Sequence, residues 1–216
     1  MRWAWTMGLV SLAVGLAGCP KPQILRFTAT PSIVCPGDAV TLSWDTNGSA
    51  WLEAIPAISG LGDQARSGTQ TLQVRESTRF RLEVTRGAKT ALTESEVLTP
   101  PRPVEYGVVD SGQPSPFTCR TEERVLETTL SLEEGNLSPQ VTLGEVRNLN
   151  ARTLVMEKAG TSATLGEAAR SSAFEGQPAL GRWRLKLPLD EGERCEDALE
   201  AVDGRLLLQF QLSCPR

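Results

Sequence analysis

The sequence contains no histidine. Histidine is the commonest general base, the commonest metal ligand and the usual activator of serine and cysteine nucleophiles. The sequence also lacks a Gly-x-Ser-x-Gly nucleophile turn and a Gly-Lys-Ser/Thr phosphate loop. We therefore predict a protein that is not an enzyme and that uses no cofactor.

Clusters of positive charge are also missing. Lys and Arg total 22 against 26 Asp and Glu, which gives a formal net charge of -4. A nucleic-acid ligand requires a basic patch that displaces counterions from the phosphate backbone. The charge pattern therefore argues against nucleic acid as a partner.

Long apolar runs are absent except near the amino terminus, where residues 3–16 follow the positively charged start Met1-Arg2. The run has the length of a signal-peptide core and is shorter than the roughly 20 apolar residues of a membrane span. It is followed by Leu16-Ala17-Gly18-Cys19 and then by Pro20. These four residues resemble the lipobox of bacterial lipoproteins.

The lipobox resemblance implies cleavage before Cys19 and attachment of acyl chains such as palmitate to Cys19. Two or more chains anchor a protein stably in a membrane. Residues 1–18 are then the signal peptide and residues 19–22 a lipidated tether. Pro20 occupies the position where Asp often retains lipoproteins in the inner membrane, so we expect the outer membrane. The alternative is an ordinary cleaved signal with an incidental cysteine.

The segment 23–98 alternates apolar and polar residues in short runs that turn residues separate. This pattern predicts an all-β sandwich. A seven-stranded module would need one strand more than the six that the pattern indicates. The six are expected at Ile24–Thr30, Ala39–Trp44, Trp51–Ile55, Thr69–Val74, Arg79–Thr85 and Ala91–Leu98.

The segments ILRFTATPSIVCPGDAVTLSW and GTQTLQVRESTRFRLEV resemble bacterial immunoglobulin-like modules. In that pattern Trp44 and Phe80 fill the space between the sheets. The resemblance implies an adhesive or spacer unit without catalytic chemistry. Trp51 follows a Gly-Ser turn, so we predict that it is half exposed and a candidate interface residue.

Three prolines within residues 99–103 predict a semi-rigid linker that joins two modules end to end. Residues 104–216 again alternate with period two and predict a second sandwich. The text AFEGQPALGRWRLKL followed by DGRLLLQFQL weakly resembles the last strands of jelly-roll P-domains. The seven strands expected here are Val104–Val109, Val125–Leu132, Gln140–Val146, Thr153–Glu157, Thr161–Leu165, Trp183–Leu187 and Arg205–Leu212.

An acidic loop from Asp190 to Asp203 carries seven carboxylates in fourteen residues. Calcium loops need oxygen ligands at alternating positions around a glycine and a closing Glu, and no register here provides them. We expect a solvated acidic loop, with a weak divalent-cation site as the alternative. No metal is predicted.

Four cysteines remain besides Cys19, and an even number in an oxidising compartment predicts two disulfides. Three connectivities are open. If the strands of the second module alternate in direction from the linker onward, Cys119 and Cys214 lie at its far pole and Cys195 returns to the linker beside Cys35. The hypothesis is therefore Cys119–Cys214 within the second module and Cys35–Cys195 between modules.

The sequence thus predicts a lipid-anchored outer-membrane protein that acts as an interaction or scaffolding component. One functional class is an accessory subunit of a motility, secretion or pilus apparatus that binds an envelope protein. The second class is a surface adhesin or carbohydrate-binding module. Carbohydrate platforms usually present several exposed aromatic side chains, and aromatic residues make up only 5% of this chain. The first class is favoured for that reason. A lipid-anchored hydrolase is the weakest of the three alternatives.

Overall fold

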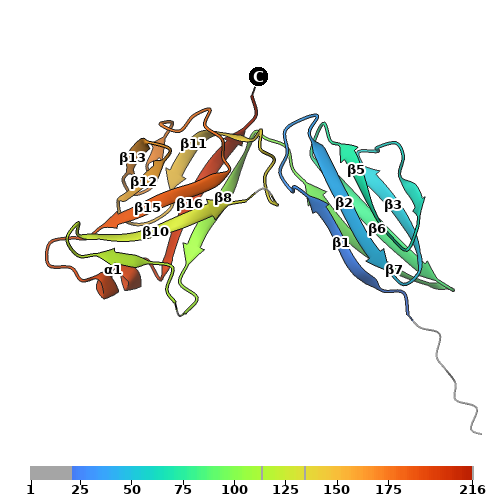
Figure 1. The fold of residues 1–216 in the computed structure, drawn as a ribbon, viewed down its shortest axis with the longest axis horizontal. Coiled ribbons are helices and arrows are strands. Elements are labelled where there is room, and N and C mark those ends of the chain that lie inside the picture. Colours follow the sequence, from blue (N-terminus) through green and yellow to red (C-terminus); the bar gives the residue numbers. More distant parts are fainter. Residues whose placement is uncertain (1–20, 113, 134, 216) are drawn as a thin grey trace, which may run out of the picture.

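The computed structural model describes residues 21–112, 114–133 and 135–215, and these residues form two β-sandwich modules arranged end to end (Figure 1). The all-β prediction is confirmed. The described residues contain one short α-helix and no helix that is long and apolar enough to cross a membrane.

The first module packs a three-stranded sheet, in the order β1-β2-β5, against a four-stranded sheet in the order β4-β3-β6-β7. All six expected strands form. The missing seventh strand is β4, a three-residue strand that begins at Gly62, just after Gly60 and Leu61. The strands are β1 Ile24–Thr30, β2 Ala39–Thr46, β3 Ser49–Ile55, β4 Gly62–Gln64, β5 Ser67–Gln73, β6 Thr78–Arg86 and β7 Lys89–Val97.

The alternation of the strands produces the core of the first module. Trp44, Leu42 and Phe80 are buried between the two sheets. The indole Nε1 of Trp44 donates a hydrogen bond to the carbonyl oxygen of Ala65 over 2.9 Å, so its polar atom is satisfied. Gly68 lies against this ring, because a Cβ there would be 2.7 Å from the Trp44 side chain. A larger residue at position 68 would displace the central tryptophan.

The second module packs a five-stranded sheet, β13-β12-β15-β10-β9, against a four-stranded sheet, β14-β11-β16-β8. All seven expected strands form, and β9, β14 and α1 are additional. The elements are β8 Arg102–Val109, β9 Thr118–Arg120, β10 Val125–Leu132, β11 Thr142–Asn148, β12 Leu154–Lys158, β13 Thr161–Leu165, β14 Arg170–Ser171, β15 Gly181–Pro188, α1 Cys195–Ala201 and β16 Arg205–Ser213.

Aromatic side chains fill the centre of the second module. Trp183 is fully buried, with its ring centroid 5.2 Å from that of Phe174 and 5.3 Å from that of Phe210. Its indole Nε1 donates to the carbonyl oxygen of Ala179 over 3.1 Å. Asn148 is also fully buried, and its amide Nδ2 lies 2.8–3.0 Å from the carbonyl oxygens of Arg152, Leu165 and Gly166. This one side chain holds the ends of several loops together.

The loop between β1 and β2 forms the junction with the second module (Figure 1). The backbone nitrogen of Ile33 donates to the carbonyl oxygen of Asn136 over 2.9 Å, and that of Ser138 donates to the carbonyl oxygen of Ile33 over 2.8 Å. Ile33 and Cys35 are buried and pack into the core of the second module. Because β8 already begins at Arg102, only the segment 98–101 connects the last strand of one module to the first strand of the next. The expected linker 99–103 is therefore shorter, and the two modules touch directly.

The four cysteines form two disulfides, and the expected pairing is wrong. Cys35 bonds to Cys214, with their Cα atoms 5.6 Å apart, and Cys119 bonds to Cys195. Cys35 and Cys119 lie at the expected poles, whereas Cys195 and Cys214 have exchanged places.

The two-residue strand β14 explains the exchange of the cysteines. It runs antiparallel to β11 and adds one reversal that the sequence does not reveal. Strand β15 therefore runs away from the junction, and β16 returns toward it, antiparallel to β8. As a result Cys214, after β16, lies at the junction, and Cys195, after β15, lies at the far pole.

Candidate interaction surface

Trp51 lies on β3 with its side chain on the outer face of the four-stranded sheet of the first module. The residue is 47% exposed, as the sequence predicted, while Trp44 and Trp183 are 3% and 0% exposed. The indole ring of Trp51 lies over Gly62, where a Cβ would be 3.8 Å from the ring. Gly62 has a φ of +125°, a conformation that favours glycine. The short strand β4 thus supports one edge of the exposed ring.

The register of the sheet places other apolar side chains near Trp51. Trp51 pairs with Glu83 on β6, and Glu83 pairs with Leu92 on β7. Leu92 therefore lies two strands from Trp51, or about 10 Å at the usual strand spacing. Ile55 is four residues further along β3, on the same face, about 13 Å from Trp51. Ile55 is 58% exposed and Leu92 is 45% exposed. We call these three side chains and the outward residues between them the Trp51 face.

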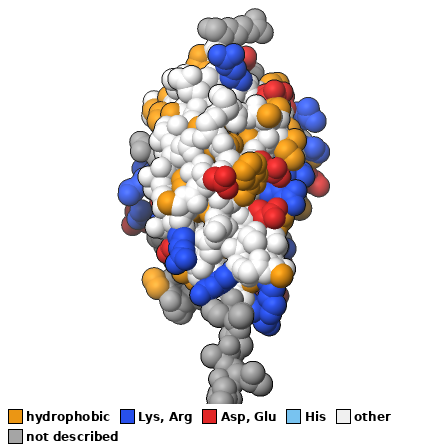
Figure 2. All heavy atoms as spheres, turned by 90° about the vertical axis from the view of Figure 1, so that its right-hand side faces the viewer, with side chains coloured by type: hydrophobic (Ala, Val, Ile, Leu, Met, Phe, Trp, Pro, Cys, Tyr) orange, Lys and Arg blue, Asp and Glu red, His pale blue; other side chains and the backbone are white. Residues whose placement is uncertain are grey.

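Charged side chains separate the apolar residues of the Trp51 face. Arg81 pairs with Glu53 at 3.2 Å, and Arg79 lies 3.7 Å from Glu94. Figure 2, which views the molecule from the side of the first module, shows hydrophobic atoms among acidic and basic groups. The Trp51 face thus mixes separate apolar side chains with ion pairs, which matches the composition of interfaces that form and dissociate, since these are about as apolar as the rest of a protein surface.

The apolar character of the first module continues around its edge. Leu25 on β1 is 66% exposed and, like Leu92, lines a shallow groove between β1 and β7. The sequence singled out Trp51 and missed Ile55 and Leu92. Their alternation with buried neighbours places them on the outer face of the sheet, and this was the signal that could have found them.

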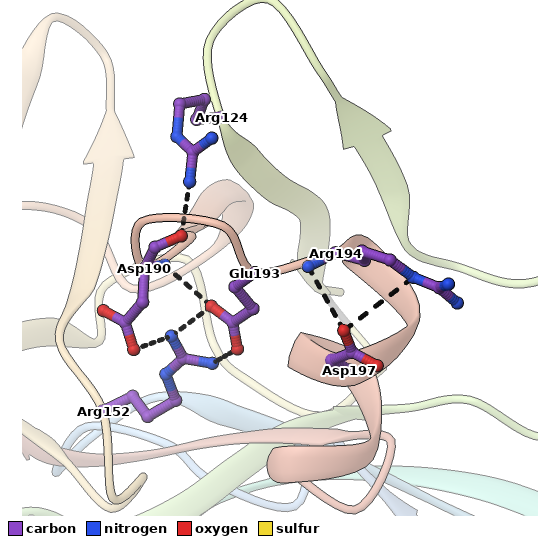
Figure 3. A network of polar contacts seen from close by, with 6 residues as sticks. All are labelled: Arg124, Arg152, Asp190, Glu193, Arg194 and Asp197. Carbon is purple, nitrogen blue, oxygen red and sulfur yellow. Dashed lines mark hydrogen bonds and ion pairs between the residues drawn. The ribbon is translucent and has the colours of Figure 1, made fainter.

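The acidic loop lies at the far pole of the second module, where arginines neutralise several of its carboxylates (Figure 3). Arg152 donates hydrogen bonds to both carboxylate oxygens of Glu193, with the bond to Oε2 at 2.5 Å, and to Asp190 over 2.9 Å. Arg124 donates to the backbone carbonyl oxygen of Asp190. The sequence did not reveal this network, because Arg152 lies far from the loop along the chain.

The hydrogen bonds from Arg152 are the main reason why the pKa of Glu193 lies below its ordinary value of 4.5. Arg194 forms ion pairs with Glu196 and Asp197, and Arg205 forms an ion pair with Asp203. Within residues 21–112, 114–133 and 135–215, no three His, Cys, Asp or Glu side chains converge in the manner of a metal site. The acidic loop is therefore built as a network of ion pairs that closes this pole of the sandwich.

Lys158 is the lysine whose environment differs most from that of a surface residue. Its ammonium group lies 4.2 Å from the ring centroid of Trp183 and donates hydrogen bonds to the carbonyl oxygens of Pro178, Ala179 and Leu180. Burial lowers its pKa to about 8. The three N–H groups of the ammonium are thus all bonded to backbone carbonyl oxygens, and the side chain stabilises the segment 178–180 that precedes β15.

Cys19 lies outside the described residues. No protein-family model matches the chain, and no curated protein matches it either. The properties of the Trp51 face are therefore the basis for a functional proposal.

Proposed function

We propose that the protein is a non-catalytic, lipid-anchored component of an envelope machine, such as a motility, secretion or pilus apparatus, and that the Trp51 face binds a protein partner. The observation that carries this proposal is the gathering of Trp51, Ile55 and Leu92 on one sheet face. Large exposed aromatic residues contribute disproportionately to the free energy of protein association.

A protein partner fits this surface better than a carbohydrate. Sugar rings stack on flat aromatic side chains, and Trp51 is the exposed tryptophan among the described residues. Its apolar neighbours are aliphatic, and the side chains between them form ion pairs. Aliphatic anchors with a charged surround match the side chains of a protein surface.

The position of strand β1 supports the proposed anchoring through Cys19. Strand β1 begins at the end of the first module that lies away from the second module (Figure 1). A lipid on Cys19, two residues before Lys21, would hold the first module next to the membrane. The second module would then extend away from the membrane surface.

Lipid attachment is tested by replacing the modified residue. The Cys19→Ala protein should retain its signal peptide and incorporate no labelled palmitate, because the lipoprotein peptidase acts on acylated cysteine. The wild-type protein should incorporate the label and fractionate with the outer membrane. Label in the Cys19→Ala protein would overturn the anchor.

The partner is tested by crosslinking in living cells, followed by purification of the protein and mass spectrometry. Wild type and Val109→Ala should recover the same envelope protein, because Val109 is exposed but belongs to the second module. Trp51→Ala should reduce that recovery by at least about tenfold, which corresponds to about 1.4 kcal/mol of binding free energy. Equal recovery with Trp51→Ala would overturn the role of the Trp51 face, and recovery of polysaccharide alone would favour the carbohydrate-binding class.

A further inference from the structure

Strand β5 is an unprotected sheet edge. Proteins usually protect edge strands with charges, proline or shortness, because an open edge pairs with other strands. The edge strands β4, β9 and β14 have three residues or fewer, β7 carries Lys89 and Glu94, and β8 carries Arg102 and Pro103. Strand β5 has seven residues, SGTQTLQ, without a charge or a proline.

The other two edges are protected by their surroundings. Strand β1 packs beside β7 of the facing sheet, and β13 has five residues and lies beside β14. The hydroxyl oxygen of Thr161 on β13 also accepts a hydrogen bond from the side-chain Nε2 of Gln177 over 2.9 Å. Strand β5 makes one contact of this kind, a hydrogen bond from the side-chain Nε2 of Gln70 to the carbonyl oxygen of Gly60 over 3.0 Å, but no strand of the described chain pairs with the outer edge of this long strand.

The hydrogen-bond register shows which backbone groups of β5 face outward. The backbone nitrogen of Thr46 donates to the carbonyl oxygen of Arg66 over 2.8 Å, and that of Val74 donates to the carbonyl oxygen of Asp38 over 3.1 Å. Pairing with β2 therefore uses the even-numbered residues, since bonded pairs alternate along an antiparallel ladder. The backbone groups of Ser67, Thr69, Thr71 and Gln73 point toward the open edge.

The residues of β5 are self-complementary about Gln70. We propose that a second copy of this chain pairs with β5 in antiparallel orientation, with Gln70 opposite Gln70 of the second copy. Thr69 then faces Thr71, and Ser67 faces Gln73, in backbone-bonded pairs on both sides of the centre. Paired hydroxyl side chains stabilise antiparallel strands, and no like charges meet in this register.

The same register extends two rows of hydroxyl groups across the interface. Thr30, Thr41 and Thr71 lie in one row of the three-stranded sheet, where the hydroxyl oxygens of Thr41 and Thr71 are 3.3 Å apart. Thr28, Ser43 and Thr69 form the neighbouring row. When Thr71 pairs with Thr69 of the second copy, the Thr71 row of each copy continues into the Thr69 row of the other. The two three-stranded sheets then form one six-stranded sheet.

The charges beside β5 are compatible with this pairing. One end of the strand is flanked by Asp63 and Arg66 and the other by Arg75 and Glu76. Each end is therefore neutral, and antiparallel copies meet without net repulsion. The two-fold axis runs along the sheet normal, so the strands of the two copies run in opposite directions and their amino termini leave at opposite ends of the paired sheet.

Disulfide crosslinking of the full-length protein in cells tests the central pair. In a non-bonded antiparallel pair the Cα atoms are about 4.5 Å apart, close enough for a disulfide. Gln70→Cys should give a covalent dimer on a non-reducing gel. Thr30→Cys is the control. Thr30 is more exposed than Gln70 but lies on β1, the opposite edge of the same sheet, so this variant should remain monomeric. No dimer with Gln70→Cys, or equal dimer with both, would overturn the proposal.

A second measurement does not depend on disulfide formation. Analytical ultracentrifugation of the full chain in detergent should show a dimer, and Thr71→Lys should raise its dissociation constant at least tenfold by placing charges next to the interface. Thr28→Lys, an exposed substitution on β1 of the same sheet, should leave the constant unchanged. A wild-type monomer, or attachment of Gln70→Cys to a different protein, would refute the second copy as the occupant. The Trp51 face belongs to the other sheet, so crosslinking to the envelope partner is scored independently.

Discussion

The two modules share an architecture but differ in what they expose. Leu25, Trp51, Ile55 and Leu92 are exposed on the first module, and Val109 is the large exposed hydrophobic residue of the second among the described residues. The second module instead carries the ion network of Arg152 and its own disulfide. A surface whose charges are already paired gains little free energy by binding an apolar partner. Exposed aromatic and aliphatic side chains gain more, because binding removes them from water. This difference supports the proposal that the first module, and not the second, carries the binding surface.

The two disulfides differ in what they connect. Cys119–Cys195 ties a three-residue edge strand to a seven-residue helix within the second module. Cys35–Cys214 joins the modules at the place where Ile33 already bonds to the second module. When one module unfolds while the other stays folded, this disulfide therefore keeps the unfolded segment tethered at both ends as a closed loop.

Removing the inter-module disulfide should have the largest effect. With Cys35→Ala and Cys214→Ala, unfolding either module no longer leaves a closed loop, so each should lose about 4 kcal/mol in the chain-entropy model. Calorimetry should show both transitions at lower temperature. A change in only one transition would show that the bridge does not couple the modules.

The matched control is removal of the other disulfide. Cys119→Ala with Cys195→Ala should lower the unfolding free energy of the second module by about 4 kcal/mol and leave the first module unchanged. A shift of the first module's transition would mean that the two modules unfold together as one unit.

The differences between sequence and structure come from short elements and long-range pairs. Alternation located thirteen strands, because five or more alternating residues are enough to define a period. Strands β4, β9 and β14 have two or three residues and carry no periodic signal. Missing β14 reversed the last two strands and exchanged Cys195 with Cys214. The helix α1 has one buried residue, Ala198, so its apolar stripe is too narrow to be recognised.

The candidate site shows the same limit. Trp51 was recognisable because it follows a turn and starts an alternating strand. Its relation to Leu92 depends on the pairing of β3 with β6 and of β6 with β7, which no local pattern contains. The partnership of Arg152 with Glu193 is likewise created by the fold.

Buried polar side chains offer the next comparison. Asn148→Ala should destabilise the second module by about 2–3 kcal/mol, because buried carbonyl oxygens lose their donor. The first module has Thr46, which is buried and whose hydroxyl donates to the carbonyl oxygens of Gly48 and Arg66. Thr46→Val should cost about 1 kcal/mol, since the methyl volume is kept. Urea denaturation measures both, and a smaller effect for Asn148→Ala would contradict the role given to this residue.

The ion network predicts a pH dependence in the second module. Folding lowers the pKa of Glu193 below its ordinary value of 4.5. The ionised carboxylate therefore stabilises the folded module fully when the pH is above 4.5, and this stabilisation is lost as the pH falls through the folded-state pKa. Glu193→Gln should lower the free energy of unfolding by about 2 kcal/mol at pH 7, with a difference from wild type that shrinks below pH 4.5. Glu191→Gln, an exposed neighbour, is the control. A constant difference from pH 7 to pH 3 would show that the carboxylate charge of Glu193 is not what matters.

The smallest stability effect is expected on the Trp51 face. Trp51→Ala should change the free energy of unfolding by less than about 1 kcal/mol, because much of the side chain is already in water. Chemical denaturation of the first module measures this value. A loss of 3 kcal/mol or more would identify Trp51 as a structural residue and would remove the reason to regard it as a binding residue.

The most direct test of the functional account is site-specific photo-crosslinking in living cells. A photoreactive phenylalanine analogue is placed at position 51 in one strain and at position 109 in another, because both sites are exposed and lie in different modules. The account predicts a discrete adduct with an envelope protein from position 51 and none from position 109. An adduct from position 109 alone, or the same adduct from both positions, would contradict the assignment of binding to the Trp51 face.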